Sequence, residues 1–116
     1  MIHEVETDLE ELVAVLKESM PKLREVRLFG SYNNGNWNPE TSDIDIGILI
    51  DGLNAGEYSI KEIGNKLKGS YRNRFQIFVC TRWGWESNYS TFNAMRSGRL
   101  LYRKRFNWDP LTWIKA

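Results

Sequence analysis

The stretch "LFGSYNNGNWNPETSDIDIGILI", residues 28–50, decides the fold because it places two aspartates inside an otherwise apolar segment. Its last part, residues 42–50, reads as a β-strand whose side chains alternate between the two faces of a sheet. The isoleucines at every second position then point one way. Asp43 and Asp45 share the other face, with their Cα atoms roughly 6.5 to 7 Å apart. Because isoleucine would pack better at either position, the two carboxylates call for an explanation.

Electrostatics offers one explanation for Asp43 and Asp45. Two anions held this close repel one another, and the repulsion raises the pKa of at least one of them. A hard divalent cation such as Mg²⁺ or Mn²⁺ prefers oxygen ligands and relieves the repulsion. The two aspartates are therefore candidate metal ligands and candidate catalytic residues. The alternative is that both are solvated on the outer face of an edge strand.

A Gly-Ser pair precedes the aspartates, at the end of a short strand predicted over residues 25–31. Gly30 allows a sharp turn and a close approach of the backbone to a ligand. Ser31 can offer its hydroxyl and its amide NH to a phosphate oxygen. If residues 31–34 begin a helical turn, the free amide groups add positive potential toward that phosphate. The pair indicates half of a phosphate site.

Hydrophobic periodicity and turn residues predict the remaining elements. Thr7 and Glu10 have capping-box spacing at the start of a first helix, which Pro21 closes. In chain order we expect a helix over 7–20, a strand over 25–31, a loop over 32–41, a strand over 42–50, an amphipathic helix over 54–69, a strand over 74–80 and a shorter helix over 87–98 with Gly98 past its end.

This element order predicts an α/β (α+β) fold, a small mixed β-sheet with helices packed mainly on one face. One strand follows a loop without an intervening helix, so at least one antiparallel pair is expected. The length of 116 residues suits a single domain, and we expect residues 1–116 to form one.

Composition excludes several classes. Hydrophobic residues make up 41% and charged residues 27%, which argues against a disordered chain or a coiled coil. No run of apolar residues is long enough to span a membrane, and the first residues are acidic, so we expect a cytoplasmic protein without a membrane partner. The net charge is +1, but residues 1–20 are acidic and residues 66–116 are basic.

The sequence contains one cysteine and one histidine. An internal disulfide and a cysteine metal cage are therefore both excluded. We interpret Cys80, beside a valine in a predicted strand, as a small core residue. His3 lies near the end of the chain and is assigned no catalytic role.

The order of strand, Gly30-Ser31, Gly35 in a loop and Ser42-Asp43-x-Asp45 resembles the DNA polymerase beta nucleotidyltransferase superfamily, and more closely its minimal nucleotidyltransferase domains. The resemblance covers essentially the whole chain and includes "MRSGRLLYRK" at its end. It implies a protein that uses a nucleoside triphosphate with Mg²⁺ or Mn²⁺. The monophosphate would be transferred to an acceptor hydroxyl, which a partner protein could carry, and pyrophosphate would leave.

The resemblance also implies residue roles. Gly30 and Ser31 would contact the triphosphate, while Asp43 and Asp45 would bind the metal ions that position it. Arg74, entering the strand over 74–80, is a further candidate for a triphosphate contact, and a surface charge is the alternative.

The match departs from the family at the third carboxylate. In the family an acidic residue stands in the middle of the later strand, where this chain has Gln76. A glutamine can ligate a cation weakly through its carbonyl oxygen but cannot act as an anionic ligand or a base. Glu86 follows that strand and is a candidate substitute. Asn34 stands where related domains often have arginine. These departures are the sequence features that argue against catalysis.

The C-terminal part mixes aromatic and basic residues, and three readings stay open. The rings can stack bases, cover one side of the sheet or form a docking surface for a protein. The residues concerned are Trp83, Trp85, Tyr89, Phe92, Tyr102, Phe106, Trp108 and Trp113 among Arg82, Arg96, Arg99, Arg103, Lys104 and Arg105. The resemblance implies a helical HEPN-type partner of the toxin and antitoxin kind. The rival of the enzyme is thus a catalytically impaired module that binds and masks such a partner. A nucleic-acid partner is the less favoured possibility.

Overall fold

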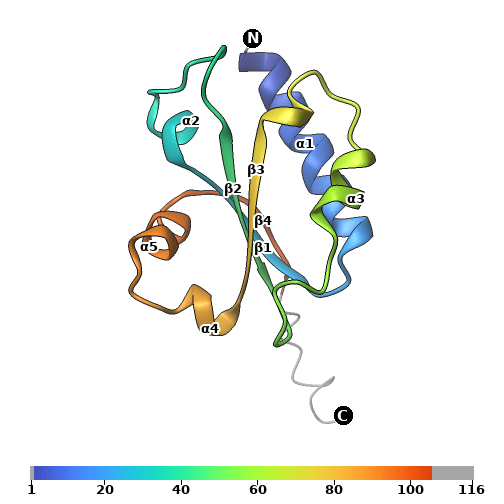
Figure 1. Cartoon of the computed structure of the whole chain (residues 1–116), viewed down its shortest axis with the longest axis vertical. Helices are drawn as coiled ribbons and strands as arrows, with labels where there is room; N and C mark the ends of the chain where they lie inside the picture. The colour runs from blue at the N-terminus through green and yellow to red at the C-terminus, as the bar shows by residue number, and fades with distance from the viewer. Residues whose placement is uncertain (1, 106–116) are drawn as a thin grey trace.

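The fold was analysed in a computed structural model, which describes residues 2–105 (Figure 1). The elements in chain order are α1 (Ile2–Ser19), β1 (Leu23–Phe29), α2 (Gly30–Asn34), β2 (Ile44–Ile50), α3 (Ile60–Asn65), the 3-10 turn η1 (Arg72–Arg74), β3 (Phe75–Thr81), α4 (Arg82–Trp85), α5 (Ser90–Arg96) and β4 (Arg99–Arg103). No helix in this part of the chain is both long and apolar enough to cross a bilayer.

The four strands form one mixed sheet in the order β3-β2-β1-β4. β1 pairs antiparallel with both β2 and β4, whereas β2 and β3 run parallel. The predicted mixed α/β sheet with an antiparallel pair is therefore confirmed. The connection through α3 and η1 is long enough to return the chain to a parallel position beside β2.

Helices lie on both faces of this sheet. Figure 1 shows α1 and α3 on one side and α2, α4 and α5 on the other. The first face carries the main core, which includes all four isoleucines of β2 at 0% exposure. The alternation of apolar residues over 42–50 thus predicted correctly which side chains of β2 are buried. The shorter helices cover only part of the second face, and the two predicted aspartates belong to that side.

A smaller apolar cluster holds α4 and α5 against the second face. It contains Phe29, Leu49, Cys80, Trp85 and Met95. Met95 packs directly over Gly47, where an added Cβ would lie 2.8 Å from the methionine Cγ. Cys80 is a core residue, as predicted, and burial raises its pKa to about 11. A thiol with so high a pKa is a poor nucleophile.

Two helix boundaries differ from the prediction. The first helix begins at Ile2, and Thr7 lies inside it, donating its hydroxyl to the carbonyl of His3 at 3.0 Å. The Thr7-Glu10 spacing therefore does not mark a cap. The helix predicted over 54–69 is shorter, because Ser59 caps its start by accepting from the amide of Glu62 at 3.2 Å.

The chain after β3 also differs from the prediction. The shorter helix predicted over 87–98 is α5, Ser90–Arg96, and Gly98 does follow its end. The prediction missed α4 and the edge strand β4. β4 forms because β1 has a free edge with which it can pair. The sequence of β4, RLLYR, alternates too weakly between apolar and polar residues to predict a strand.

The acidic start of the chain has a structural role. Asp8 is 7% exposed and accepts a hydrogen bond from the amide of Tyr71 at 2.7 Å. Glu11 accepts from the amides of Lys68 and Gly69, each at 3.0 Å. These carboxylates fix the loop that leads into β3, so α1 determines where β3 begins.

We predict that Asp8→Ala destabilises the protein by about 1 to 3 kcal/mol, since the partly buried amide of Tyr71 loses its charged acceptor. Glu10→Ala is the matched control because Glu10 is exposed on the same helix. Urea unfolding of both variants measures the difference. Equal midpoints would show that the Asp8 contact does not stabilise the fold.

Candidate functional site

Asp45 is the second residue of β2 and lies next to the turn made by Gly30. The register places Asp45 opposite Phe29 of β1, so the residue after Phe29 meets the carboxylate. Gly30 has a φ of 77°, and a methyl group added there would overlap the Asp45 carboxylate. Only glycine fits both the backbone conformation and this space. The turn and the carboxylate therefore form one site.

Asp43 precedes the first residue of β2 and is exposed. Burial raises the pKa of the half-buried Asp45, and the negative charge of Asp43 raises it further. The two carboxylates are thus close enough to repel, as the sequence indicated. Neither forms an ion pair with another residue in the described range, so their charge is not neutralised there.

Gln76 is the register partner of Asp45 on the parallel neighbour β3. Register partners project to the same face of a sheet, so the exposed amide of Gln76 stands beside the carboxylate. Within residues 2–105 no three His, Cys, Asp or Glu side chains come together as a possible metal site. Glu86 is not the missing third acid: it lines a different cavity, together with Leu49 near the other end of β2.

The loop before Asp43 is held by two side chains that donate to one carbonyl. Trp37 donates its indole NH to the carbonyl of Ser42 at 3.0 Å. Arg74 donates to the same carbonyl and to that of Pro39. The peptide bond that leads into Asp43 is therefore fixed in place.

The Trp37 ring is itself fixed by aromatic neighbours. Its centroid lies 5.2 Å from that of Tyr32 and 5.8 Å from that of Tyr71, both in edge-on contact. Sequence reasoning missed Trp37, because the many Asn, Gly and Pro residues made 32–41 read only as a turn. A tryptophan within so polar a loop was the available signal. The contact of Arg74 with a triphosphate stays a prediction.

Residues 30–34 do form a short helix, α2, and Gly35 ends it with a φ of 81°. The Ser31 hydroxyl makes no hydrogen bond to the part of the chain that the structure describes, so it stays free for a ligand. Tyr32 donates its hydroxyl to Glu6 at 2.8 Å. Burial first, and then this bond, raise the pKa of Tyr32 to about 12. The bond ties α2 to α1.

Comparisons with known proteins agree with this geometry. A family model described as a nucleotidyltransferase domain matches residues 9–101. The fold is similar to the crystal structure of a protein from Sulfolobus solfataricus that is provisionally assigned as a nucleotidyltransferase. That likeness has a TM-score of 0.56 and 22% identity, and it covers 89% of this chain and 86% of that one. A search of curated proteins finds no match.

The pKa of Asp45 provides a direct check of the geometry. We predict that Asp43→Asn lowers the pKa of Asp45 in metal-free buffer, because one of the two causes of its elevation is removed. Burial remains, so the pKa should stay above the ordinary value of 3.8. Carboxyl-detected NMR titration measures this shift. Asp51→Asn, at the far end of β2, is the control and should leave the Asp45 titration unchanged.

Proposed function

This chain belongs to the nucleotidyltransferase domain family, a part of the DNA polymerase beta superfamily, and on that premise we propose that it transfers a nucleoside monophosphate from a nucleoside triphosphate to an acceptor hydroxyl. The observation that carries the proposal is the close packing of the Asp45 carboxylate against the Gly30 turn, with Asp43 beside it. The groups to which we assign phosphate and cation binding therefore lie together at one end of a sheet face.

The side chains at this end fit a hard divalent cation. Asp43 and Asp45 offer carboxylate oxygens whose mutual repulsion a cation would relieve. Gln76 adds a neutral amide oxygen on the same face. Mg²⁺ commonly takes one or two protein carboxylates and completes its shell with water and phosphate oxygens. We therefore assign Mg²⁺ or Mn²⁺ to these residues as the proposed cofactor.

Each of these residues then has a separate role in the proposed transfer reaction. Gly30 lets the triphosphate approach the backbone, and Ser31 donates its free hydroxyl to a phosphate oxygen. A bound cation would stabilise the charge that develops on the α-phosphoryl group. Trp37 and Arg74 keep the loop before Asp43 in position. The bond between the α-phosphorus and the acceptor oxygen forms as the bond to pyrophosphate breaks.

Gln76 favours a second candidate function. Without a third carboxylate, the chain would be a catalytically impaired member of its family that binds and masks a partner protein, for which a helical HEPN-type protein is the proposed example. Trp83, 87% exposed, offers an aromatic side chain of the kind that anchors protein interfaces. This candidate retains nucleotide binding without turnover.

A transfer assay separates the two functions. The protein is incubated with each labelled nucleoside triphosphate, Mg²⁺ or Mn²⁺, and the product of the neighbouring gene as acceptor. We predict label transfer that Asp45→Asn reduces at least about a hundredfold, the scale of losing one main electrostatic contact to a transition state. Asp51→Asn is the matched control and should keep full transfer. Partner binding without transfer, unchanged in Asp45→Asn, would instead support masking.

The third ligand position can be tested by restoring the acid. We predict that Gln76→Asp binds Mn²⁺ several-fold more tightly, because a third anion then faces the register position of Asp45. Asn73→Asp adds the same charge at an exposed position in η1 and serves as control. Calorimetric titration with Mn²⁺ measures both affinities. Equal affinities in the two variants would show that position 76 does not face the cation.

A further inference from the structure

A second cavity, of about 520 Å³, opens on the sheet face that carries Asp45 but near the other end of β2. Its floor includes Leu49, four residues along the strand from Asp45, which corresponds to about 13 Å. Met95 covers Gly47 between the two positions. The cavity is therefore separate from the proposed nucleotidyl-transfer site, and its size is in the usual range for ligand pockets.

The cavity is strongly basic. The cationic side chains that line it are Arg24, Arg82, Arg103, Lys104 and Arg105. Against these five stand two carboxylates, Glu25 and Glu86, so its lining has an excess of positive charge. Such an excess in a recess attracts an anion.

The paired charges in the lining are easily identified. Arg24 contacts Asp51 at 3.5 Å, and Arg103 contacts Glu25 at 3.1 Å. Glu25 is 8% exposed and is also bound by Arg27 at 2.5 Å, so its charge is already shared between two arginines. It therefore does little to neutralise the rest of the lining.

Three cations of the lining have no partner among the residues that the structure describes. The side chains of Arg82, Lys104 and Arg105 form no hydrogen bond or ion pair with any residue in the range 2–105. All three are exposed. Three cations around one recess suit a ligand with several phosphates better than a single small anion, because each neutralised phosphate adds to the affinity.

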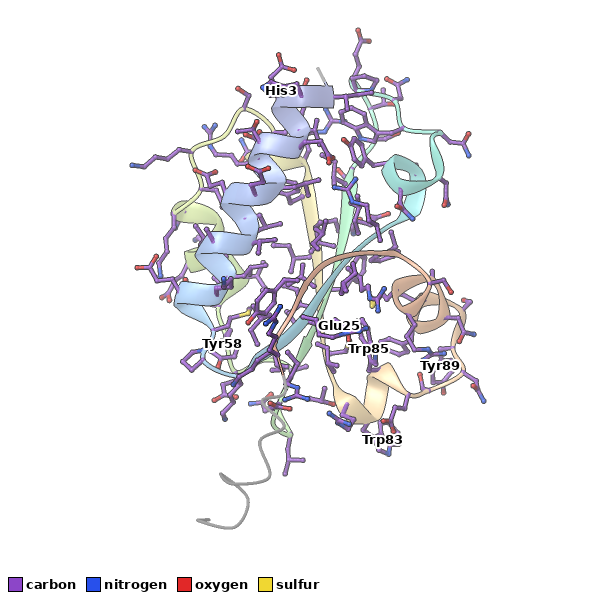
Figure 2. The ribbon with its side chains drawn as sticks, turned by 180° about the vertical axis from the view of Figure 1, so that it is seen from behind. His3, Glu25, Tyr58, Trp83, Trp85 and Tyr89 are labelled. Carbon is purple, nitrogen blue, oxygen red and sulfur yellow. The ribbon has the colours of Figure 1, made fainter. Side chains whose placement is uncertain are left out.

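Aromatic side chains accompany the free cations. Trp85 forms part of the cavity lining, and Trp83, on the same short helix α4, is 87% exposed. Tyr89, just before α5, is 72% exposed. Figure 2 shows Trp83 and Tyr89 at the outer side of this end of the molecule, with Trp85 and Glu25 further in. An exposed ring beside cations, as Trp83 is beside Arg82, is a feature on which the bases of single-stranded nucleic acids stack.

We propose that this basic cavity binds single-stranded nucleic acid, with phosphates at Arg82, Lys104 and Arg105 and a base stacked on Trp83. An acidic protein is the alternative ligand, since it would also satisfy the cations; the exposed Trp83 ring beside Arg82 is the feature that favours a base. The inference goes beyond the proposed transfer activity, because it requires neither Asp43 nor Asp45.

Fluorescence anisotropy with a labelled single strand of about ten nucleotides tests this site. We expect saturable binding of the full chain to labelled RNA or DNA, with affinity that falls as salt rises. Arg82→Glu and Lys104→Glu should each weaken binding and reduce the slope of log affinity against log salt by about one. Trp83→Ala should weaken binding with little change in that slope.

Two further variants keep the test sharp. Glu86→Lys should strengthen binding, because it removes an acid from the lining and adds a cation. Lys61→Glu makes the same charge change as Lys104→Glu. Lys61 is an exposed residue of α3, which covers the opposite sheet face, so this variant should leave affinity nearly unchanged.

Absence of saturable binding, no gain in Glu86→Lys, or an equal loss in Lys61→Glu would overturn the proposal. So would a polyglutamate peptide that competes as well as the oligonucleotide, which would point to an acidic protein partner instead. Asp45→Asn should bind the strand as tightly as the unchanged protein. Failure of this site is therefore distinguishable from failure of the proposed transfer activity.

Discussion

The close approach between Gly30 and the Asp45 carboxylate is the constraint on which the candidate site depends. It requires β1 to end at Phe29, opposite Asp45, and it requires the next residue to turn with a positive φ. Any side chain at position 30 would push the carboxylate away or open the antiparallel pair. The pairing of β1 with β2 therefore does more than build the sheet, because it sets the distance between the turn and the acid.

The same arrangement is electrostatically unfavourable without a cation. The raised pKa of Asp45 means that the folded state disfavours its ionised form. Stability contributed by this group is present at low pH and is lost as pH rises above 3.8 through the folded pKa. The apolar core under β2 and the contact of Asp8 with the Tyr71 amide support the fold against this repulsion. A protein tolerates such a pair most readily where a ligand neutralises it.

Local patterns were enough to predict the centre of the fold. Alternation in β2 placed its isoleucines in the core and Asp45 on the other face, and the mixed sheet followed from element order. Features that depend on distant residues escaped prediction. β4 is a strand because β1 has a free edge, and Trp37 matters because its indole reaches the carbonyl of Ser42. The spacing of neighbouring residues in the sequence predicts neither the pairing of β4 with β1 nor the hydrogen bond of Trp37.

One sheet face carries two environments of opposite charge, and Gly47 lies between them on β2. Met95 of α5 sits over that glycine, so the helix packs low across the middle of the face and leaves both ends open. Two carboxylates lie at the end near Gly30, and an excess of cations lies at the end near Leu49. A larger residue at position 47 would displace Met95, since even a Cβ there would lie 2.8 Å from the methionine Cγ. Leu49 lies about 13 Å along the strand from Asp45, which exceeds the Debye length of about 8 Å at physiological ionic strength, so salt largely screens the two ends from one another and each can attract its own kind of ion.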